Sequence, residues 1–307
     1  MSEPSSAFAP VSMSRYASDF DGFAQDLGAS WQRYGFAVVS DHGLNQAVID
    51  RALADAKAFF ALPAEVKRAY HEPGTGGARG YTPFGTERAK EAAVQDLKEF
   101  WHVGRSLPSG DPLERYMPPN VWPEEVPEFR RTFEALFGAF DEAGLRILSA
   151  IALHLGLEGD FFAPTVESGN SVLRLLHYPP VPAGAEGAVR AAAHEDINAI
   201  TLLLGAEEAG LELLARDGRW LPVSPPPGAL AVNIGDMLQR LTARRLRSTT
   251  HRVVNPAGEA ARRSRYSMPF FLHFRPDFLI EPMGEGGEEP ITADEYLQQR
   301  LREFNLA

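Results

Sequence analysis

The sequence contains no cysteine, and this absence removes whole classes of chemistry. Disulfides, thiolate metal sites and cysteine nucleophiles are all excluded from the 307-residue chain. Any metal ion must therefore be held by nitrogen and oxygen ligands. Positive charge is also scarce, since 30 Lys and Arg face 41 Asp and Glu and give a formal net charge of -11. So acidic a chain is poorly suited to nucleic acid or to an anionic membrane, and we expect neither as a partner.

Long apolar runs are missing as well. No segment approaches the roughly 18 apolar residues that a transmembrane helix needs. The first residues, MSEPSSAFAPVSMSRY, have neither the basic start nor the apolar centre of a secretory signal. We therefore predict a cytoplasmic protein without a membrane partner. The 44% of hydrophobic and 23% of charged residues are typical of a globular protein that can bury its own core.

The first half of the chain is mainly helical by pattern. Apolar residues recur at spacings of three and four from Phe20 to Tyr34, with Ser18 as the expected N-cap and Gly35 as the end of the helix. The FAVVS segment at 36–40 then predicts a short strand, because it is apolar, β-branched and followed by turn residues.

Two further helices are expected over 44–60 and over 129–155, where the apolar stripe is longest. Between them, residues 73–90 contain too much glycine and proline for either period, so we predict a loop. A loop of this length inside a folded domain is usually functional or mobile.

After residue 170 the pattern changes to short β-rich runs separated by turn residues. These runs are SVLRLLHY, AITLLLG, LELLA, WLPVS, ALAVNIG, THRVVN and YSMPFFLHF. Such a series predicts a sandwich or barrel, and a jelly roll satisfies it. The last segment, from 291, returns to a helix with Thr292 as its cap. We expect one unit of mixed α and β class, with a mainly helical region at 1–165, a jelly-roll core at 166–280 and a helical tail at 281–307.

The stretch AAAHEDINAI at 191–200 places a histidine and an aspartate two residues apart. Such residues share one side of an extended chain, so His194 and Asp196 can reach one point while Glu195 faces away. We expect the strand that fixes them to run from Ile197 onward. Two histidines and one carboxylate are the facial triad of non-haem Fe(II) oxygenases. The pair alone is a weak signal, because similar pairs are common in surface turns.

The third ligand of such a triad would be a histidine on a neighbouring strand. Among the eight histidines, His251 in STTHRVVN stands at the start of a β-rich run. The gap back to Asp196 is wide enough for several strands, and an antiparallel barrel can bring the two segments side by side.

Arg265 and Ser267, in RYS, are again two residues apart on a predicted strand. An arginine fork with a hydroxyl beside it matches a carboxylate, which suggests a pocket for the distal carboxylate of a small diacid. The alternative is a solvated arginine on the outer side of a strand. If the pair faces inward, Pro269 and Phe271 continue the same wall.

In LRLLHYPP, Tyr178 shares one side of the strand with Leu176 and Arg174. If Tyr178 points into the barrel, Arg174 does too, and a buried arginine needs an anionic partner. That partner is either an internal carboxylate or a substrate carboxylate. His177 then faces the opposite layer as a core histidine with its own partners.

Taken together, HED at 194–196, STTHRVVNP at 248–256 and RYSMPFF at 265–271 resemble the isopenicillin N synthase-like family. This family is a branch of the Fe(II)/2-oxoglutarate-dependent oxygenases. LRLLHYPP, GFAVVSDHGL and DLKEFWHVGR extend the resemblance over most of the chain. It implies a distorted double-stranded β-helix, which is a jelly roll, with N-terminal helices packed around it.

The resemblance also implies a set of site residues. Fe(II) would be held by His194, Asp196 and His251. The cosubstrate 2-oxoglutarate would be held by Arg265 and Ser267 at its distal carboxylate, with Tyr178 nearby. The implied reaction uses dioxygen to oxidise, by hydroxylation, a small-molecule substrate and releases succinate and CO2. We expect ascorbate to stimulate it.

Two alternatives stay open. Some relatives of this family use the iron triad without 2-oxoglutarate, and a jelly roll can also be a binding module without catalysis. The candidate substrate residues are Arg174, Tyr81, Phe84, Phe100 and Phe271, although core packing explains each aromatic residue equally well. A buried Arg174 would favour an anionic or amino-acid-like substrate. The patterns do not predict an oligomeric state.

Overall fold

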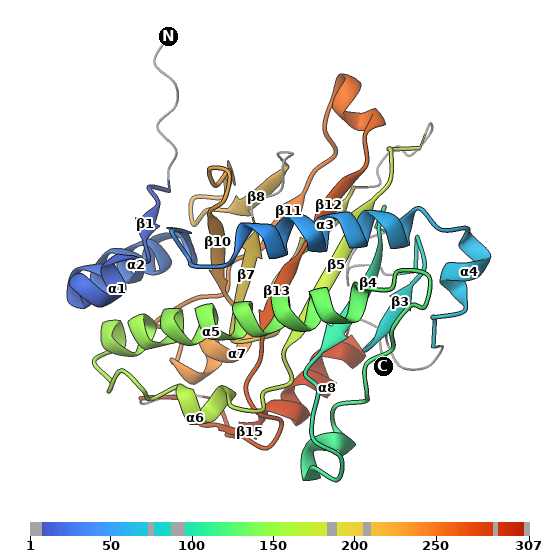
Figure 1. Cartoon of the computed structure of the whole chain (residues 1–307). Coiled ribbons are helices and arrows are strands. Elements are labelled where there is room, and N and C mark those ends of the chain that lie inside the picture. The colour runs from blue at the N-terminus through green and yellow to red at the C-terminus, as the bar shows by residue number, and fades with distance from the viewer. Residues whose placement is uncertain are drawn as a thin grey trace.

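The structure is a computed structural model that describes residues 8–72, 77–86, 96–182, 189–204, 210–284 and 288–303. Two β-sheets pack face to face, and a layer of helices covers the outer side of the larger sheet (Figure 1). The larger sheet has nine strands. Its described pairs are antiparallel except for β1 with β2.

The strands of the larger sheet come from both halves of the chain. Their order is β1 (Val11–Ser12), β2 (Phe36–Ser40), β10 (Leu230–Ile234), β7 (Ile200–Leu204), β13 (Pro269–Leu272), β5 (Val172–Tyr178), β4 (Glu99–Gly104) and β3 (Gly80–Thr82), and β12 (Arg265–Ser267) also pairs with β5. The smaller sheet has the order β6 (Ala191–His194), β11 (His251–Val253), β8 (Leu211–Leu214) and β9 (Trp220–Pro222). A separate pair joins β14 (Leu279–Ile280) to β15 (Ile291–Thr292).

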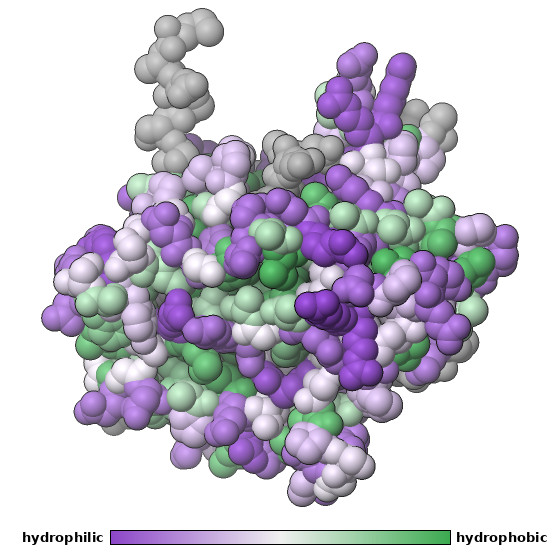
Figure 2. All heavy atoms as spheres, in the orientation of Figure 1, coloured by the Kyte–Doolittle hydropathy of each residue, from purple (hydrophilic) through white to green (hydrophobic). Residues whose placement is uncertain are grey.

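The helix layer is built around the longest helix, α5. The described helices are α1 (Arg15–Ser18), α2 (Phe20–Tyr34), α3 (Gln46–Phe60), α4 (Ala64–Arg68), α5 (Phe129–Leu155), α6 (Ala163–Val166), α7 (Asp236–Leu241) and α8 (Ala293–Glu303), with 3-10 turns η1 (Pro112–Arg115) and η2 (Gly258–Arg262). Both α2 and α3 pack against α5, and α5 packs against β13 and β7. On this side of the molecule, hydrophilic and hydrophobic side chains are intermixed (Figure 2). None of the described helices has the length and apolarity needed to span a bilayer.

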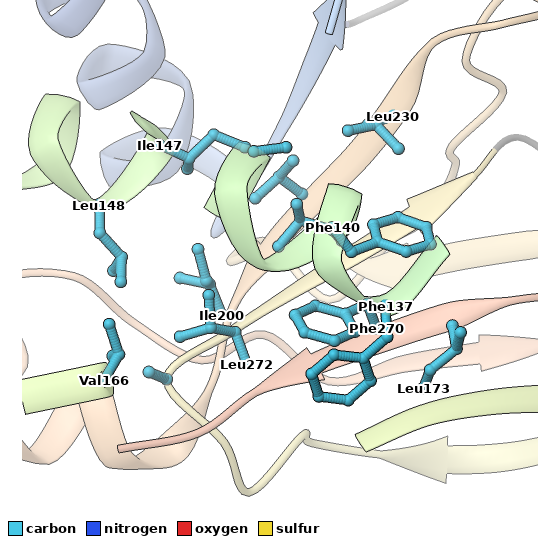
Figure 3. Close-up of a cluster of buried hydrophobic side chains, with 14 of the residues drawn as sticks. Phe137, Phe140, Ile147, Leu148, Val166, Leu173, Ile200, Leu230, Phe270 and Leu272 are labelled. Atoms are coloured by element: carbon cyan, nitrogen blue, oxygen red, sulfur yellow. The ribbon is translucent and has the colours of Figure 1, made fainter. Parts of the chain in front are cut away.

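Aromatic side chains of α5 cover the sheet (Figure 3). The Phe270 ring of β13 stacks on Phe140, with ring centroids 5.3 Å apart and planes 3° from parallel. Phe137 meets the same ring edge-on, with centroids 5.0 Å apart. All three side chains are buried. Burying one such ring contributes about 1.5–3 kcal/mol, so this contact is a main source of the attachment of α5 to the sheet.

The strands of the larger sheet have two sides with different roles. On β5, Leu173 and Leu175 belong to the core under the helices, and we call this the helix-facing side. Leu176 and Tyr178 belong instead to a small cluster with Phe100, on what we call the inner side. This separation follows from the period of two in a strand. The inner side faces the smaller sheet.

A second apolar core lies between the two sheets. It joins Phe36 and Val38 of β2 to Leu211 and Leu213 of β8, among other residues. Gly35 makes the sharp turn from α2 into β2, because its φ of 69° suits glycine and a Cβ there would lie 2.0 Å from Thr249 Oγ1. The glycine therefore lets α2, β2 and the segment before β11 approach closely.

Several sequence predictions are confirmed. The jelly-roll core with surrounding helices is present, α2 ends at Gly35, and α5 spans the predicted 129–155. The tail helix α8 begins after Thr292, whose Oγ1 accepts the Glu295 N–H while Glu295 accepts the Thr292 hydroxyl. The proposed division at residue 165 stays a prediction, and β1 to β4, from before it, all belong to the larger sheet.

Two local predictions are wrong. The N-cap of α2 is Asp19 rather than Ser18, because the Asp19 carboxylate accepts the Gly22 N–H at 3.2 Å. The predicted loop at 73–90 contains a strand at its centre, since Gly80–Thr82 pairs with β4. Residues 73–76 and 87–90 of that segment lie outside the described residues.

Candidate metal centre and active site

His194, Asp196 and His251 converge at the inner edge of the smaller sheet. His194 on β6 and His251 on β11 are direct cross-strand partners, with ring centroids 4.4 Å apart. Asp196 Oδ1 lies 3.7 Å from His194 Nε2 and 3.8 Å from His251 Nε2. One potential ligand atom from each residue lies within 4.8 Å of the others. The predicted pairing of the two strands is therefore confirmed.

Backbone hydrogen bonds set the tautomers of both histidines. His194 Nδ1 lies 2.8 Å from Ala192 O, and His251 Nδ1 lies 3.0 Å from Thr249 O. A carbonyl oxygen can only accept, so each Nδ1 carries a proton, and Nε2 is the nitrogen that offers a lone pair when the imidazole is neutral. Both lone pairs belong to the atoms nearest Asp196, which is the donor arrangement a divalent metal ion needs.

The Asp196 carboxylate is held at one oxygen and open at the other. Thr201 Oγ1 of β7 donates to Oδ2 at 2.6 Å, and Asn233 Nδ2 of β10 donates to the same oxygen at 2.8 Å. Thr201 and Asn233 are cross-strand partners in the larger sheet. The remaining oxygen, Oδ1, is the one that approaches the two histidines. Donors of this kind fix the direction of a ligand before the metal binds.

The segment between β6 and β7 is a turn rather than a strand, which corrects the prediction of a strand from Ile197 onward. The start of α7 holds this turn: Asp236 N donates to Asp196 O at 2.7 Å and Met237 N to Ile197 O at 3.1 Å. These bonds replace a strand ladder, and β7 begins only at Ile200. Glu195 accepts a hydrogen bond from Thr250 Oγ1 at 2.9 Å.

The electrostatics of the site favour the protonation states that bind metal. Burial, followed by the charge of His251, lowers the pKa of His194 to about 4. Burial alone would raise the pKa of Asp196, but the two histidines and the Thr201 and Asn233 hydrogen bonds outweigh it and leave this pKa below its ordinary value. At neutral pH, His194 is therefore neutral and Asp196 is an anion, as metal ligands must be.

Arg265, Ser267 and Tyr178 lie together on the inner side of the larger sheet. Arg265 pairs across strands with Tyr178, and its guanidinium carbon lies 5.1 Å from the centre of the Tyr178 ring. All three side chains are at most 6% exposed. The guanidinium carbon of Arg190 lies 5.8 Å from the centre of the same ring, so two guanidinium groups lie close to Tyr178.

Three of the five candidate substrate residues also meet on the inner side. The Arg174 guanidinium lies 4.3 Å from the Phe100 ring centre and 5.3 Å from that of Phe271. Arg174 Nε donates to His102 Nε2 at 2.6 Å, and His102 Nδ1 lies 2.5 Å from Gly77 O. The histidine is therefore neutral and holds the arginine in place.

Tyr81 and Phe84 lie elsewhere, which differs from their predicted place in the pocket. Tyr81 is on the helix-facing side, with its ring 5.8 Å from Phe59 of α3 and its hydroxyl bonded to Glu99. Trp101 of β4 lies directly opposite Tyr81 in the sheet, and cross-strand partners face the same side. Phe84 is 42% exposed and belongs to neither apolar core. His177 has partners at both nitrogens, Glu99 and Ser264, as predicted for a core histidine.

His273 is a further inner-side residue that the sequence reasoning missed. Phe270 and Leu272 face α5, so His273 and Phe271 lie on the inner side. The side chain is 8% exposed, and among the described residues its Nδ1 has no hydrogen-bond partner. The signal was available, because the alternation that links Arg265 to Phe271 reaches His273 in one more step.

A jelly roll with two histidines and one carboxylate on its inner wall defines a class of protein, the non-haem Fe(II) oxygenases. The donor set fits that ion, since three ligands on one side leave positions open for a cosubstrate and dioxygen. Arg265, on the inner side, carries the guanidinium group that proteins commonly use to bind a carboxylate.

Comparisons with known proteins agree with this class. The family model described as non-haem dioxygenase in morphine synthesis N-terminal matches residues 9–125, and the 2OG-Fe(II) oxygenase superfamily model matches residues 169–274. The chain is 38% identical to the proline hydroxylase buaE of Petromyces alliaceus, covering 92% of this chain and 93% of that protein. It is 34% identical to the 2-oxoglutarate-Fe(II) type oxidoreductase hxnY of Emericella nidulans, covering 87% and 79%.

Two solved structures are similar over almost the whole chain. A 2OG-Fe(II) oxygenase family protein of Caulobacter crescentus superposes with a TM-score of 0.90 at 58% identity, covering 97% of this chain and 99% of that one. A full-length Neurospora crassa protein in complex with alpha-KG superposes with a TM-score of 0.87 at 27% identity, covering 98% of both. The chain therefore belongs to the Fe(II)/2-oxoglutarate-dependent oxygenases. It is an oxidoreductase that uses Fe(II), 2-oxoglutarate and dioxygen on a small molecule.

Proposed function

We propose that the chain hydroxylates a small anionic molecule. In this proposal Fe(II) is held by His194, Asp196 and His251. The cosubstrate is held by Arg265, Ser267 and Tyr178. Arg174 then binds the anionic group of the substrate, between the rings of Phe100 and Phe271. A cytoplasmic location stays a prediction from the sequence, which cell fractionation would test.

The observation that carries the proposal is a second inner-side cation, Arg174, on the strand that carries Tyr178. Arg174 and Tyr178 are four positions apart on β5, which is roughly 13 Å along the strand. Arg174 therefore supplies a second cationic position on the inner side, beside Phe100 and Phe271. A guanidinium between two aromatic rings, aligned by a neutral histidine, is arranged to bind a carboxylate or another planar anion.

The chain's own groups divide the work of the reaction. One oxygen atom of O2 becomes the new hydroxyl of the substrate, the other enters succinate, and C1 of 2-oxoglutarate leaves as CO2. Iron, when bound, supplies the activation of dioxygen that this C–H oxidation requires. Arg265 and Ser267 donate hydrogen bonds to the distal carboxylate of the cosubstrate. Phe100 and Phe271 exclude water beside the substrate, and Arg174 orients its C–H bond.

A paired substrate panel tests the proposal. L-Proline is included because a relative is a proline hydroxylase, together with phenylacetate, hexanoate and the amide of each acid. We expect at least one acid, but not its amide, to raise succinate formation above the substrate-free rate. Replacing Arg174 with Met keeps much of the side-chain length but removes a charge-assisted bond worth about 1.5–3 kcal/mol, so kcat/KM for that acid should fall roughly 10- to 100-fold.

Arg275→Met is the matched control, because this arginine forms a part-exposed ion pair with Asp277 and is not one of the proposed site residues. Its kcat/KM should equal that of the unmodified protein. Equal turnover of an acid and its amide, unaffected by Arg174→Met, would contradict an anionic substrate. Oxygen uptake that does not depend on 2-oxoglutarate would contradict the cosubstrate assignment.

A further inference from the structure

The strand that carries His194 has an open edge. In the described part of the chain, β6 is the end strand of the smaller sheet and pairs with β11 alone. The register between the two strands also shifts between His251 and Val253. Such an irregularity leaves residues of one strand without a ladder partner. Ala192 lies in the shifted stretch, so the sheet itself holds this residue weakly.

A side chain from outside the sheet forms a hydrogen bond with the backbone at this edge. Asp96 Oδ1 accepts the backbone N–H of Ala192 at 3.1 Å. Its other oxygen, Oδ2, accepts from Lys98 Nζ at 2.8 Å. Asp96 is 4% exposed and Lys98 is 7% exposed. A buried carboxylate and a buried ammonium are costly unless they are paired, so this pair belongs to the interior and holds the edge of β6 from there.

The same residue connects the carboxylate to the metal ligand. Ala192 receives support at its N–H from Asp96, and its carbonyl accepts from His194 Nδ1 at 2.8 Å. Ala192 therefore stands between Lys98 and Asp96 on one side and the imidazole on the other. Movement of the Ala192 backbone would rotate the ring and turn Nε2 away from Asp196 and His251.

We propose that Asp96, with its charge balanced by Lys98, is a positioning residue for the metal ligand His194. The inference rests on the proposed function, since it takes His194 as a ligand. Asp96 does not touch the metal or the substrate. It acts through the Ala192 backbone, whose N–H and C=O belong to successive peptide groups, in the manner of outer residues whose loss typically costs 10- to 100-fold in metal affinity or activity.

The test compares Asp96→Ala with Asp96→Asn. Asparagine keeps an oxygen acceptor for the Ala192 N–H, whereas alanine does not. Anaerobic titration of Fe(II) in the presence of 2-oxoglutarate, followed by the visible charge-transfer absorption, measures the Kd for iron. We expect Asp96→Ala to raise this Kd about tenfold or more. Amide hydrogen exchange in residues 191–194 should become faster in the same variant.

A double variant separates the hydrogen bond from the ion pair. Asp96→Asn combined with Lys98→Met keeps an acceptor for Ala192 and leaves neither charge buried. If orientation of Ala192 is the role of Asp96, the double variant should recover most of the iron affinity. An iron Kd that stays as high as in Asp96→Ala, despite slow exchange at 191–194, would overturn the role of the hydrogen bond.

Asp55→Ala is the matched control for a purely structural effect. Asp55 is 6% exposed and accepts from Arg51 at 3.0 Å and from Thr132 at 2.7 Å, so it too is a buried carboxylate with one cationic and one neutral donor. It joins α3 to α5, away from β6. We expect its thermal stability to fall while its iron Kd is unchanged.

The possible failures are distinguishable. If the unmodified protein gives no absorption band with Fe(II) and 2-oxoglutarate, the proposed function fails. If that band forms and Asp96→Ala leaves both the iron Kd and the exchange rates unchanged, only the positioning role fails. If Asp55→Ala raises the iron Kd as much as Asp96→Ala, the effect is general destabilisation and the positioning role is again overturned.

Discussion

Two buried polar residues on opposite sides of the larger sheet differ in their hydrogen bonding. On the helix-facing side, Glu99 accepts from Lys67 Nζ at 2.8 and 2.9 Å and is bonded to His177 and Tyr81. These groups satisfy one another. On the inner side, His273 Nδ1 has no hydrogen-bond partner among the described residues.

The difference separates buried polar groups that folding explains from those that have no partner within the protein. A closed network such as that of Glu99 is explained by folding, because each desolvated charge has an opposite charge or a donor beside it. An unpartnered buried group such as His273 Nδ1 costs about 1–3 kcal/mol, so it marks a position where a water molecule or a ligand would supply the missing partner. Adjacent residues of a strand face opposite sides of the sheet. One strand can therefore carry a paired polar group on one side and an unpartnered polar group on the other.

The largest expected effect is on the inner wall of the barrel. Replacing Asp196 with Ala removes the only carboxylate of the triad and the acceptor of the Thr201 and Asn233 hydrogen bonds. We expect succinate formation to fall at least about a thousandfold, a change that corresponds to roughly 4 kcal/mol. The charge-transfer absorption with Fe(II) and 2-oxoglutarate should disappear. Normal turnover in this variant would remove Asp196 from the ligand set.

On the helix-facing side, the change should appear in stability instead. Replacing Glu99 with Ala leaves the Lys67 ammonium without its buried counter-ion, and breaking such a pair costs about 3–5 kcal/mol. Urea unfolding should show this loss, while the Kd for 2-oxoglutarate of the folded variant changes little. Glu99→Gln retains acceptors and should be less destabilised. If Glu99→Ala changed the affinity for 2-oxoglutarate strongly without lowering stability, the proposed difference between the two sides would be wrong.

The smallest effect is a pH dependence that His273 should cause. Burial lowers the pKa of His273 to about 4, whereas the unfolded chain takes up the proton near the ordinary value of 6.5. The unfolded state therefore binds more protons below pH 6.5, and stability falls as the pH is lowered from 6.5 toward 4. The loss amounts to about 3 kcal/mol at most, at roughly 1.36 kcal/mol per pKa unit.

Comparison with His273→Asn isolates this contribution. Both proteins should be freed of metal with a chelator, because His194 also has a lowered pKa and contributes equally to each. Unfolding free energies between pH 4 and pH 7 should then decline more steeply in the unmodified protein. Parallel curves would show that His273 is not held neutral by burial.

Much of the fold could be predicted because its signals are local. Gly35 ends α2 because the left-handed conformation suits glycine, and the period of two assigned Arg265, Ser267 and Phe271 to one wall. The series of short β-rich runs after residue 170 predicted a barrel, and the order of HED, His251 and the arginine strand then pointed to an iron site. These features depend on neighbours within a few residues, or on the repetition of one element type.

What could not be predicted depends on distant partners. The residues after His194 have a strand-like pattern, but their backbone groups bond to the start of α7, far along the chain, and this turns the chain into the other sheet. Tyr81 follows glycine, and only the pairing of β3 with β4 decides which side it faces. Nothing in the sequence distinguishes Asp96 from other acidic residues. Its role as an acceptor depends on where the fold places the backbone of Ala192.

The turn at 195–199 has a mechanical consequence. The two histidines belong to the smaller sheet, whereas Asp196 is bonded to Thr201 and Asn233 of the larger sheet. An ion held by all three is a cross-link between the two walls of the barrel. Such an ion would add to the apolar core that already holds the two sheets together. Binding of the ion would then stabilise the packing of the two sheets against unfolding.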